Sequence, residues 1–124
     1  IAYCFAEKTG YSKFGSYTGN NNTDGAFIYT GFKPAFLIIK NSAVTEHWVM
    51  HDSKRPGYNG NGYYLYPNLS NAEEANNTNH SVDLVSNGFK VRSNNDQWND
   101  AETMIYMAFG QSLVGSNNIP CTAR

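Results

Sequence analysis

Apolar residues in this chain come in short alternating runs, and turn-forming residues separate almost every run from the next. Alternation with a period of two places successive side chains on opposite faces of a β-strand. The clearest signal is Ser86-Asn87-Gly88, which separates the alternating residues 81–85 from residues 89–92. Asn-Gly between two such runs is the strongest short-range indication of a β-hairpin. The pattern therefore predicts antiparallel strands.

The same alternation predicts strands along most of the chain. We expect them at residues 1–6, 11–17, 27–30, 35–40, 46–51, 63–66, 81–85, 89–92 and 103–109. Residues 35–40 are the most continuous apolar run, which indicates a central strand buried on both faces. About eight or nine short strands with little or no helix predict an all-β fold, namely an antiparallel β-sandwich of jelly-roll or lectin-like type.

The alternation in residues 103–109 also predicts which side chains lie together. Met104, Tyr106 and Ala108 should share one face of this strand, and the opposite face should carry Ile105, Met107 and Phe109. In residues 46–51, Trp48 and Met50 should lie opposite His47, Val49 and His51.

Composition supports an all-β chain and excludes several classes of protein. Asn occurs 17 times, and Asn, Gly, Ser and Thr together fill 46 of the 124 positions. These residue types favour turns over helices, whereas an aromatic content of 15% is too high for a disordered chain. A formal net charge of −1 provides no basic surface for nucleic acid. No run approaches the roughly 18 apolar residues that insertion into a membrane needs.

No linker, repeat or charge block divides the chain, so residues 1–124 should form a single domain. Residues 110–124 form an irregular tail in this interpretation. Ile1 starts a strand-like run without an initiator Met, so we expect the chain to be a piece of a longer protein. Cys4 and Cys121 lie near opposite ends, and we expect them to remain unpaired, because two cysteines alone do not indicate an oxidising compartment.

The sequence contains no pattern typical of catalysis or metal binding. No nucleophile elbow, zincin motif, phosphate-binding loop or Cys-x-x-Cys pair occurs. His47 and His51 would lie roughly 13 Å apart on a strand, too far to share one ion, so we expect partly exposed polar residues. Asp96-Gln97-Trp98-Asn99-Asp100 lacks the glycine and terminal glutamate of an EF-hand loop. We therefore expect no catalytic residue, no metal and no cofactor.

Aromatic side chains in polar loops are the best indication of a binding site. Tyr and Trp offer large rigid contact areas, and Asn, Ser and Gly add adaptable hydrogen bonds, a mixture that suits glycan or protein surfaces. Trp98 is the residue that we most expect at the surface. The alternation of residues 63–66 fits a packed core equally well. The predicted ligand-binding residues are Tyr58, Tyr63, Tyr64, Asn95, Asp96 and Trp98.

Four segments give the chain a resemblance to a known family. They are Gly10-Tyr11-Ser12-Lys13-Phe14-Gly15-Ser16-Tyr17-Thr18-Gly19-Asn20, Asp24-Gly25-Ala26-Phe27-Ile28-Tyr29-Thr30-Gly31-Phe32-Lys33-Pro34-Ala35, Ser86-Asn87-Gly88-Phe89-Lys90-Val91-Arg92 and Ile105-Tyr106-Met107-Ala108-Phe109. The chain resembles a C-terminal domain of unknown function in large structural proteins of tailed bacteriophages, especially marine and cyanobacterial phages. Members occur in virion, tail-fibre-like and adhesin-like proteins, and the family carries no catalytic residues to transfer.

The resemblance implies a virion component that assembles in the bacterial cytoplasm and is exposed on the particle. We expect a non-enzymatic structural module of a fibre, tail or capsid-decorating protein, with other virion subunits as partners. Homo-oligomers are expected, and trimers by analogy with fibres. Its loops would present a site for a host-surface glycan. Because the loops are rich in Asn and Gly and poor in charge, such binding should depend little on salt.

Two alternatives to this function remain open. The domain could serve assembly alone and bind no receptor, and an exposed apolar patch together with stable self-association would favour that role. The third alternative is a secreted carbohydrate-binding module or a glycan depolymerase. A depolymerase would require two acidic residues that face each other at glycosidase separations, roughly 5 to 9.5 Å.

Overall fold

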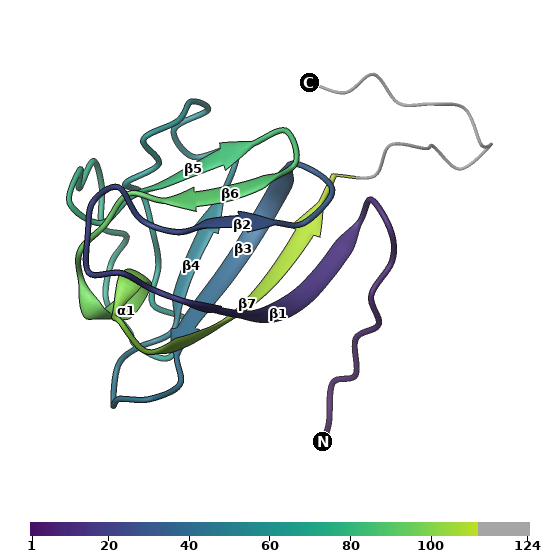
Figure 1. Ribbon diagram of the computed structural model, residues 1–124, viewed down its shortest axis with the longest axis horizontal. Coiled ribbons are helices and arrows are strands. Elements are labelled where there is room, and N and C mark those ends of the chain that lie inside the picture. The colour runs from purple at the N-terminus through teal and green to yellow at the C-terminus, as the bar shows by residue number, and fades with distance from the viewer. Residues whose placement is uncertain (112–124) are drawn as a thin grey trace.

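The computed structural model describes residues 1–111, and they form an all-β fold with two antiparallel sheets (Figure 1). The four-stranded sheet has the order β1-β7-β3-β4, and the three-stranded sheet has the order β2-β6-β5. The elements are β1 (Ser12–Thr18), β2 (Phe27–Tyr29), β3 (Pro34–Asn41), β4 (Val49–Asp52), β5 (Val82–Val85), β6 (Gly88–Val91), α1 (Asp96–Asn99) and β7 (Thr103–Gly110). The predicted antiparallel sandwich is confirmed.

The two sheets face each other across one hydrophobic core. The fully buried ring of Phe89 on β6 lies 5.4 Å from the ring of Tyr106 on β7 and 6.1 Å from that of Tyr17 on β1. Both contacts are edge-to-face, the arrangement that aromatic quadrupoles favour. Burying such a side chain stabilises the fold by about 1.5–3 kcal/mol, so contacts between the layers hold the sandwich together.

The β5–β6 hairpin forms at the predicted place. Val85 pairs with Gly88, which leaves Ser86 and Asn87 as a two-residue loop. The close approach of β2, on the other side of β6, also requires a glycine at position 88. A Cβ at this position would lie 2.1 Å from the carbonyl oxygen of Ile28 on β2. The absence of a side chain therefore lets β2 approach β6 closely enough to pair.

The inner and outer faces of β7 match the predicted alternation. Met104, Tyr106 and Ala108 are buried, and the other face is less covered. The expectation that residues 35–40 are buried on both faces is wrong. Leu37 and Ile39 are fully buried, whereas Phe36 and Ile38 on the opposite face are only partly covered. The reason is that the three-stranded sheet covers only one side of the four-stranded sheet.

Seven strands are present in residues 1–111, fewer than the predicted eight or nine. Residues 1–6 form no strand and are exposed, because they pair with no strand edge. Instead, the Lys8–Ser12 bridge turns the chain, and the amide of Phe14 on β1 donates to Glu7 Oε1 at 3.1 Å. Figure 1 shows this N-terminal segment outside the two sheets, on the side of β1.

Residues 63–66 also form no regular strand, but they close one side of the sandwich. Asn61 pairs with Val82 of β5, and Leu65 pairs with Met50 of β4 through isolated bridges. The segment thus links the edge strands of the two sheets. A third bridge joins Tyr64 to Glu74.

The polar segment of residues 93–100 contains a one-turn helix. The Asn95 side chain caps α1 by accepting a hydrogen bond from the amide of Gln97 at 2.9 Å. The Asn41 side chain at the end of β3 donates to the carbonyl of Asp96 at 2.8 Å, which attaches the helix to the sheet. No helix within residues 1–111 is long and apolar enough to cross a membrane.

The prediction that an irregular tail begins at residue 110 is wrong by one residue, because Gly110 is the last residue of β7. Residues 112–124, including Cys121, lie outside the described residues. Cys4 is exposed in the N-terminal segment. The predicted unpaired state of the two cysteines therefore stays a prediction.

Candidate functional site

Trp98 lies in the core, so the prediction that it is a surface ligand-binding residue is wrong. Its side chain is 0% exposed, and its indole Nε1 donates to His51 Nε2 at 2.8 Å. The rings of Tyr64 and His80 lie 4.9 and 4.7 Å from the indole, the former edge-on and the latter stacked. Four aromatic rings therefore form a packed cluster. They belong to His51 on β4, to Tyr64 and His80 in the long loop between β4 and β5, and to Trp98 on α1. Tyr64 itself is 2% exposed, which also removes it from a surface site.

His51 is fully buried, which corrects the expectation of a partly exposed residue. Burial lowers its pKa to about 4, although the Tyr63 carbonyl and the Asn61 side chain act in the opposite direction. The imidazole is therefore neutral near pH 7. Since Nε2 accepts the hydrogen bond of Trp98, Nδ1 carries the proton. Nδ1 makes no hydrogen bond of normal geometry within residues 1–111, and the Tyr63 carbonyl and the Asn61 side chain act on it only through weaker contacts. Partial burial also lowers the pKa of His80.

Asn95 and Asp96 shape the local backbone. The Asn95 side chain is occupied as the cap of α1, and the main chain of Asp96 is held by Asn41. The buried Asn99 side chain continues this network, since its Nδ2 donates to Asn20 Oδ1, the Asn22 carbonyl and the Ser93 carbonyl at 2.7–2.8 Å. These contacts fix the loop between β1 and β2 against α1.

Of the predicted site residues, Tyr58 alone is both a large aromatic and highly exposed, at 67%. It lines an open cavity of about 260 Å³ together with Lys33, Ser53, Asn59 and Leu84. A second cavity of about 230 Å³ shares Lys33 and Ser53 with the first. Tyr63 is half-buried and lines neither cavity. The six predicted residues therefore do not converge on one site.

The outer face of the four-stranded sheet is a second surface of interest. The register places Phe14 beside Met107, Met107 beside Ile38, and Ile38 beside Met50. These four side chains form one apolar row across all four strands, and each is only partly covered. The outward apolar side chains are Phe14, Phe36, Ile38, Trp48, Met50, Ile105, Met107 and Phe109, and we call them the outer face.

The chain's own N-terminal segment already lies on one corner of the outer face. The ring of Phe5 is 6.1 Å from that of Phe14 and 5.7 Å from that of Phe109. Ile1 and Tyr3 follow the same alternation but remain highly exposed, at 117% and 83%. The rest of the outer face is partly exposed within residues 1–111, and a shallow apolar hollow of about 90 Å³ lies between Ile38, Trp48 and Met107.

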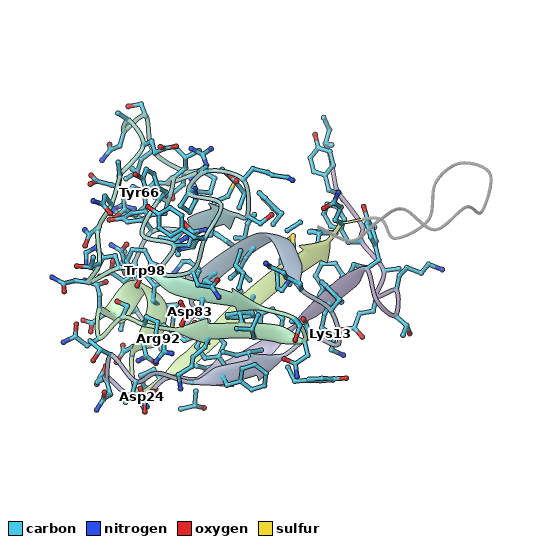
Figure 2. All side chains as sticks on the ribbon, turned by 90° about the horizontal axis from the view of Figure 1, so that it is seen from above. Lys13, Asp24, Tyr66, Asp83, Arg92 and Trp98 are labelled. Atoms are coloured by element: carbon cyan, nitrogen blue, oxygen red, sulfur yellow. The ribbon has the colours of Figure 1, made fainter. Side chains whose placement is uncertain are left out.

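Five of the ten carboxylates in residues 1–111 belong to surface ion pairs. Asp24 contacts Lys90 at 2.8 Å and Arg92 at 3.4 Å, and Arg92 also binds Asp83 at 2.7 Å. Figure 2 shows Asp24, Arg92 and Asp83 on the same side of the molecule. The hydrogen bond and charge of Lys90 lower the pKa of Asp24. A glycosidase acid needs the opposite shift.

The pKa values of two other carboxyl groups are also lowered. The pKa of Asp52 is lowered because hydrogen bonds from Lys54 and Arg55 outweigh partial burial, which acts to raise it. The hydrogen bond from Lys13 lowers the pKa of Glu7. Within residues 1–111, no group of three His, Cys, Asp or Glu side chains could hold a metal ion.

Residues 1–112 match the family described as a domain of unknown function, DUF7483. This chain belongs to the DUF7483 family. Comparisons with curated proteins and with solved structures gave no match.

The sequence analysis did not identify the outer face as a candidate site, although two strands carry the pattern that indicates it. Residues 35–40 and 103–109 are apolar on both faces, a property of strands that are covered on both sides. We interpreted this signal as burial within the domain. In this DUF7483 domain the three-stranded sheet covers one side of these strands, and within residues 1–111 the other side is only partly covered.

Proposed function

We propose that this DUF7483 domain is a non-enzymatic assembly module of a bacteriophage fibre, tail or capsid-decorating protein, and that its outer face packs against a second copy of the chain. The carrying observation is the apolar row Phe14, Met107, Ile38 and Met50. An antiparallel sheet with one solvated face normally places polar side chains on that face. The virion context rests on the sequence resemblance.

A second copy is the occupant that suits this surface best. Sheet faces pack flat against one another about 10 Å apart, and a two-fold pair uses the same patch on both partners. An apolar face is complementary to itself, since it needs no matching charges. Phe5 shows that the face accepts an aromatic ring from an extended segment, and the exposed Ile1 and Tyr3 provide further apolar area beside it.

The magnitudes allow association only when nearly the whole outer face is covered. Two of its eight residues, Trp48 and Ile105, are 38% exposed, and the other six are less exposed. Covering each of them therefore contributes less than about 1 kcal/mol. Association costs an estimated 4–15 kcal/mol in lost freedom, so most of the face must be covered for a stable dimer. A contact limited to one corner would be too weak.

Sedimentation velocity on the 124-residue chain tests this proposal. We expect the wild-type chain to form a dimer at micromolar concentration. Ile38→Lys places a charge in the centre of the apolar row and should give a monomer with unchanged circular dichroism. Ser86→Lys is the matched control, because Ser86 is exposed in the β5–β6 loop of the other sheet and does not belong to the outer face. A monomeric wild type at about 100 μM, or an assembly that Ile38→Lys leaves unchanged, would contradict the proposal.

A further inference from the structure

Five of the eleven residues that line the two adjoining cavities beside Tyr58 carry unused hydrogen-bond donors. Ser53 Oγ, Asn59 Nδ2 and the Tyr58 hydroxyl make no hydrogen bond to any described residue. Lys33 and Lys54 also line these cavities, and neither ammonium group forms an ion pair within residues 1–111. None of the described side chains that line the two cavities is acidic.

The surrounding structure holds these donors in place. Asn59 Oδ1 accepts the amide of Leu84 at 3.0 Å, which turns its Nδ2 away from β5. The buried Asn61 donates to the Asp52 carbonyl at 2.7 Å and accepts the amide of Tyr63 at 3.2 Å, so the floor is fixed. The amide of Ser53 donates to the Ala35 carbonyl at 2.9 Å. The loop is therefore anchored to β3, β4 and β5, while its donor groups remain free.

We infer that these cavities bind an acidic saccharide, with a carboxylate or another anionic group on the sugar held by Lys33 and Lys54. Sugar hydroxyls and carboxylates supply the acceptors that Ser53 and Asn59 lack. The exposed ring of Tyr58 offers a flat apolar surface against which the C–H face of a sugar packs. Ligand pockets for drug-sized molecules measure about 300–1,000 Å³, so cavities of about 260 and 230 Å³ suit one sugar ring each.

This inference goes beyond the assembly role and does not depend on it. The residues involved lie in the loops before β3 and after β4, and none of them belongs to the outer face. It places the saccharide site at the loop that carries the exposed Tyr58, and not at the predicted position of Trp98, which is buried. The two lysines make binding sensitive to salt, in contrast to the expectation drawn from the low charge content.

Isothermal titration calorimetry with trigalacturonate, and with its methyl ester as the neutral probe, tests this inference on the full chain. We expect trigalacturonate to bind at least tenfold more tightly than the ester, a difference of about 1.4 kcal/mol, and to weaken as salt is raised. Tyr58→Ala and Lys33→Ala should each weaken binding at least about fivefold. Tyr29→Ala and Lys8→Ala are the matched controls, because Tyr29 is 66% exposed and Lys8 is also an exposed lysine, both away from these cavities.

Three outcomes would overturn the inference. They are equal affinity for the acid and the ester, no binding of trigalacturonate at millimolar concentration, and equal loss in the Tyr58 variant and its Tyr29 control. The Ile38→Lys monomer should bind the probe as wild type does. Failure of the saccharide site and failure of the assembly interface are therefore observed separately.

Discussion

The indole Nε1 of Trp98 donates a hydrogen bond to Nε2 of His51 at 2.8 Å, and both side chains are fully buried. This bond joins α1 to β4 at the point where the long loop closes the sandwich. It also fixes the tautomer of the imidazole, because the accepting nitrogen carries no proton. The pair therefore holds helix and sheet together in the core of the fold.

Replacing Trp98 should destabilise the domain strongly. Trp98→Phe removes the indole donor, leaves His51 Nε2 without its partner and creates a small cavity against Tyr64 and His80. We expect a loss of about 2–4 kcal/mol in the free energy of unfolding. Urea denaturation at low protein concentration measures it. The second tryptophan provides the control: Trp48 is 38% exposed, and Trp48→Phe should change the free energy by less than about 1 kcal/mol.

Stability should fall as the pH drops from about 6.5 towards 4. The pKa of His51 is lowered from 6.5 to about 4 by burial, so the unfolded chain binds its proton first. The stability that the neutral imidazole provides is complete above pH 6.5 and is lost as the pH approaches the folded pKa. The full effect is about 3 kcal/mol, and the lowered pKa of His80 adds in the same direction.

Urea denaturation between pH 4 and pH 8 measures this dependence. His51→Gln removes the titrating group and should flatten the profile between pH 4 and 6.5, even though the variant is less stable at pH 7. A wild-type stability that stays constant down to pH 4 would contradict the buried neutral state of His51. Below about pH 4 the ion-paired carboxylates Asp24 and Glu7 protonate and add a separate loss.

Local sequence signals predicted the parts of the fold that depend on neighbours in sequence. Ser86-Asn87-Gly88 specified its hairpin, and the alternation of residues 103–109 specified which side chains face the core. Turn chemistry and a period of two act over a few residues, so they can be identified from one sequence. They cannot indicate how many faces of a sheet are covered, and therefore the open face of β3 was predicted as buried.

Trp98 shows why the candidate site was predicted wrongly. Its neighbours Asp96, Gln97, Asn99 and Asp100 are polar, and such a segment indicates a surface loop. Asn99 is nevertheless buried, because its side chain bonds to Asn20 and Asn22, 79 and 77 residues away in sequence. Hydrogen bonds over such separations compensate for burying a polar side chain, and no local pattern indicates them. Tyr58 was predicted correctly as exposed because it lies between Gly and Asn residues that pair with no strand.

The Asn99 side chain should be essential for the loop between β1 and β2. Asn99→Ala removes three contacts made by Nδ2 and leaves the amide of Asn20 without the acceptor that lies 3.0 Å away. We expect a loss of about 2–4 kcal/mol, because buried groups lose their partners. Asn94→Ala is the control, since Asn94 is an exposed asparagine in the same segment. Thermal unfolding followed by circular dichroism measures both, and equal melting temperatures would show that the network contributes little.

Gly88→Ala should loosen the three-stranded sheet without disrupting the four-stranded one. The added Cβ would lie 2.1 Å from the carbonyl oxygen of Ile28, an atom of the β2 backbone that cannot move without breaking the β2–β6 pairing. Because β2 is an edge strand of only three residues, it should separate from β6 before the core opens. Hydrogen exchange should then show faster exchange at Ile28 and Thr30, with β3 and β7 still protected. Ser86→Ala in the exposed hairpin loop is the control, and the same exchange pattern in both variants would refute this role for Gly88.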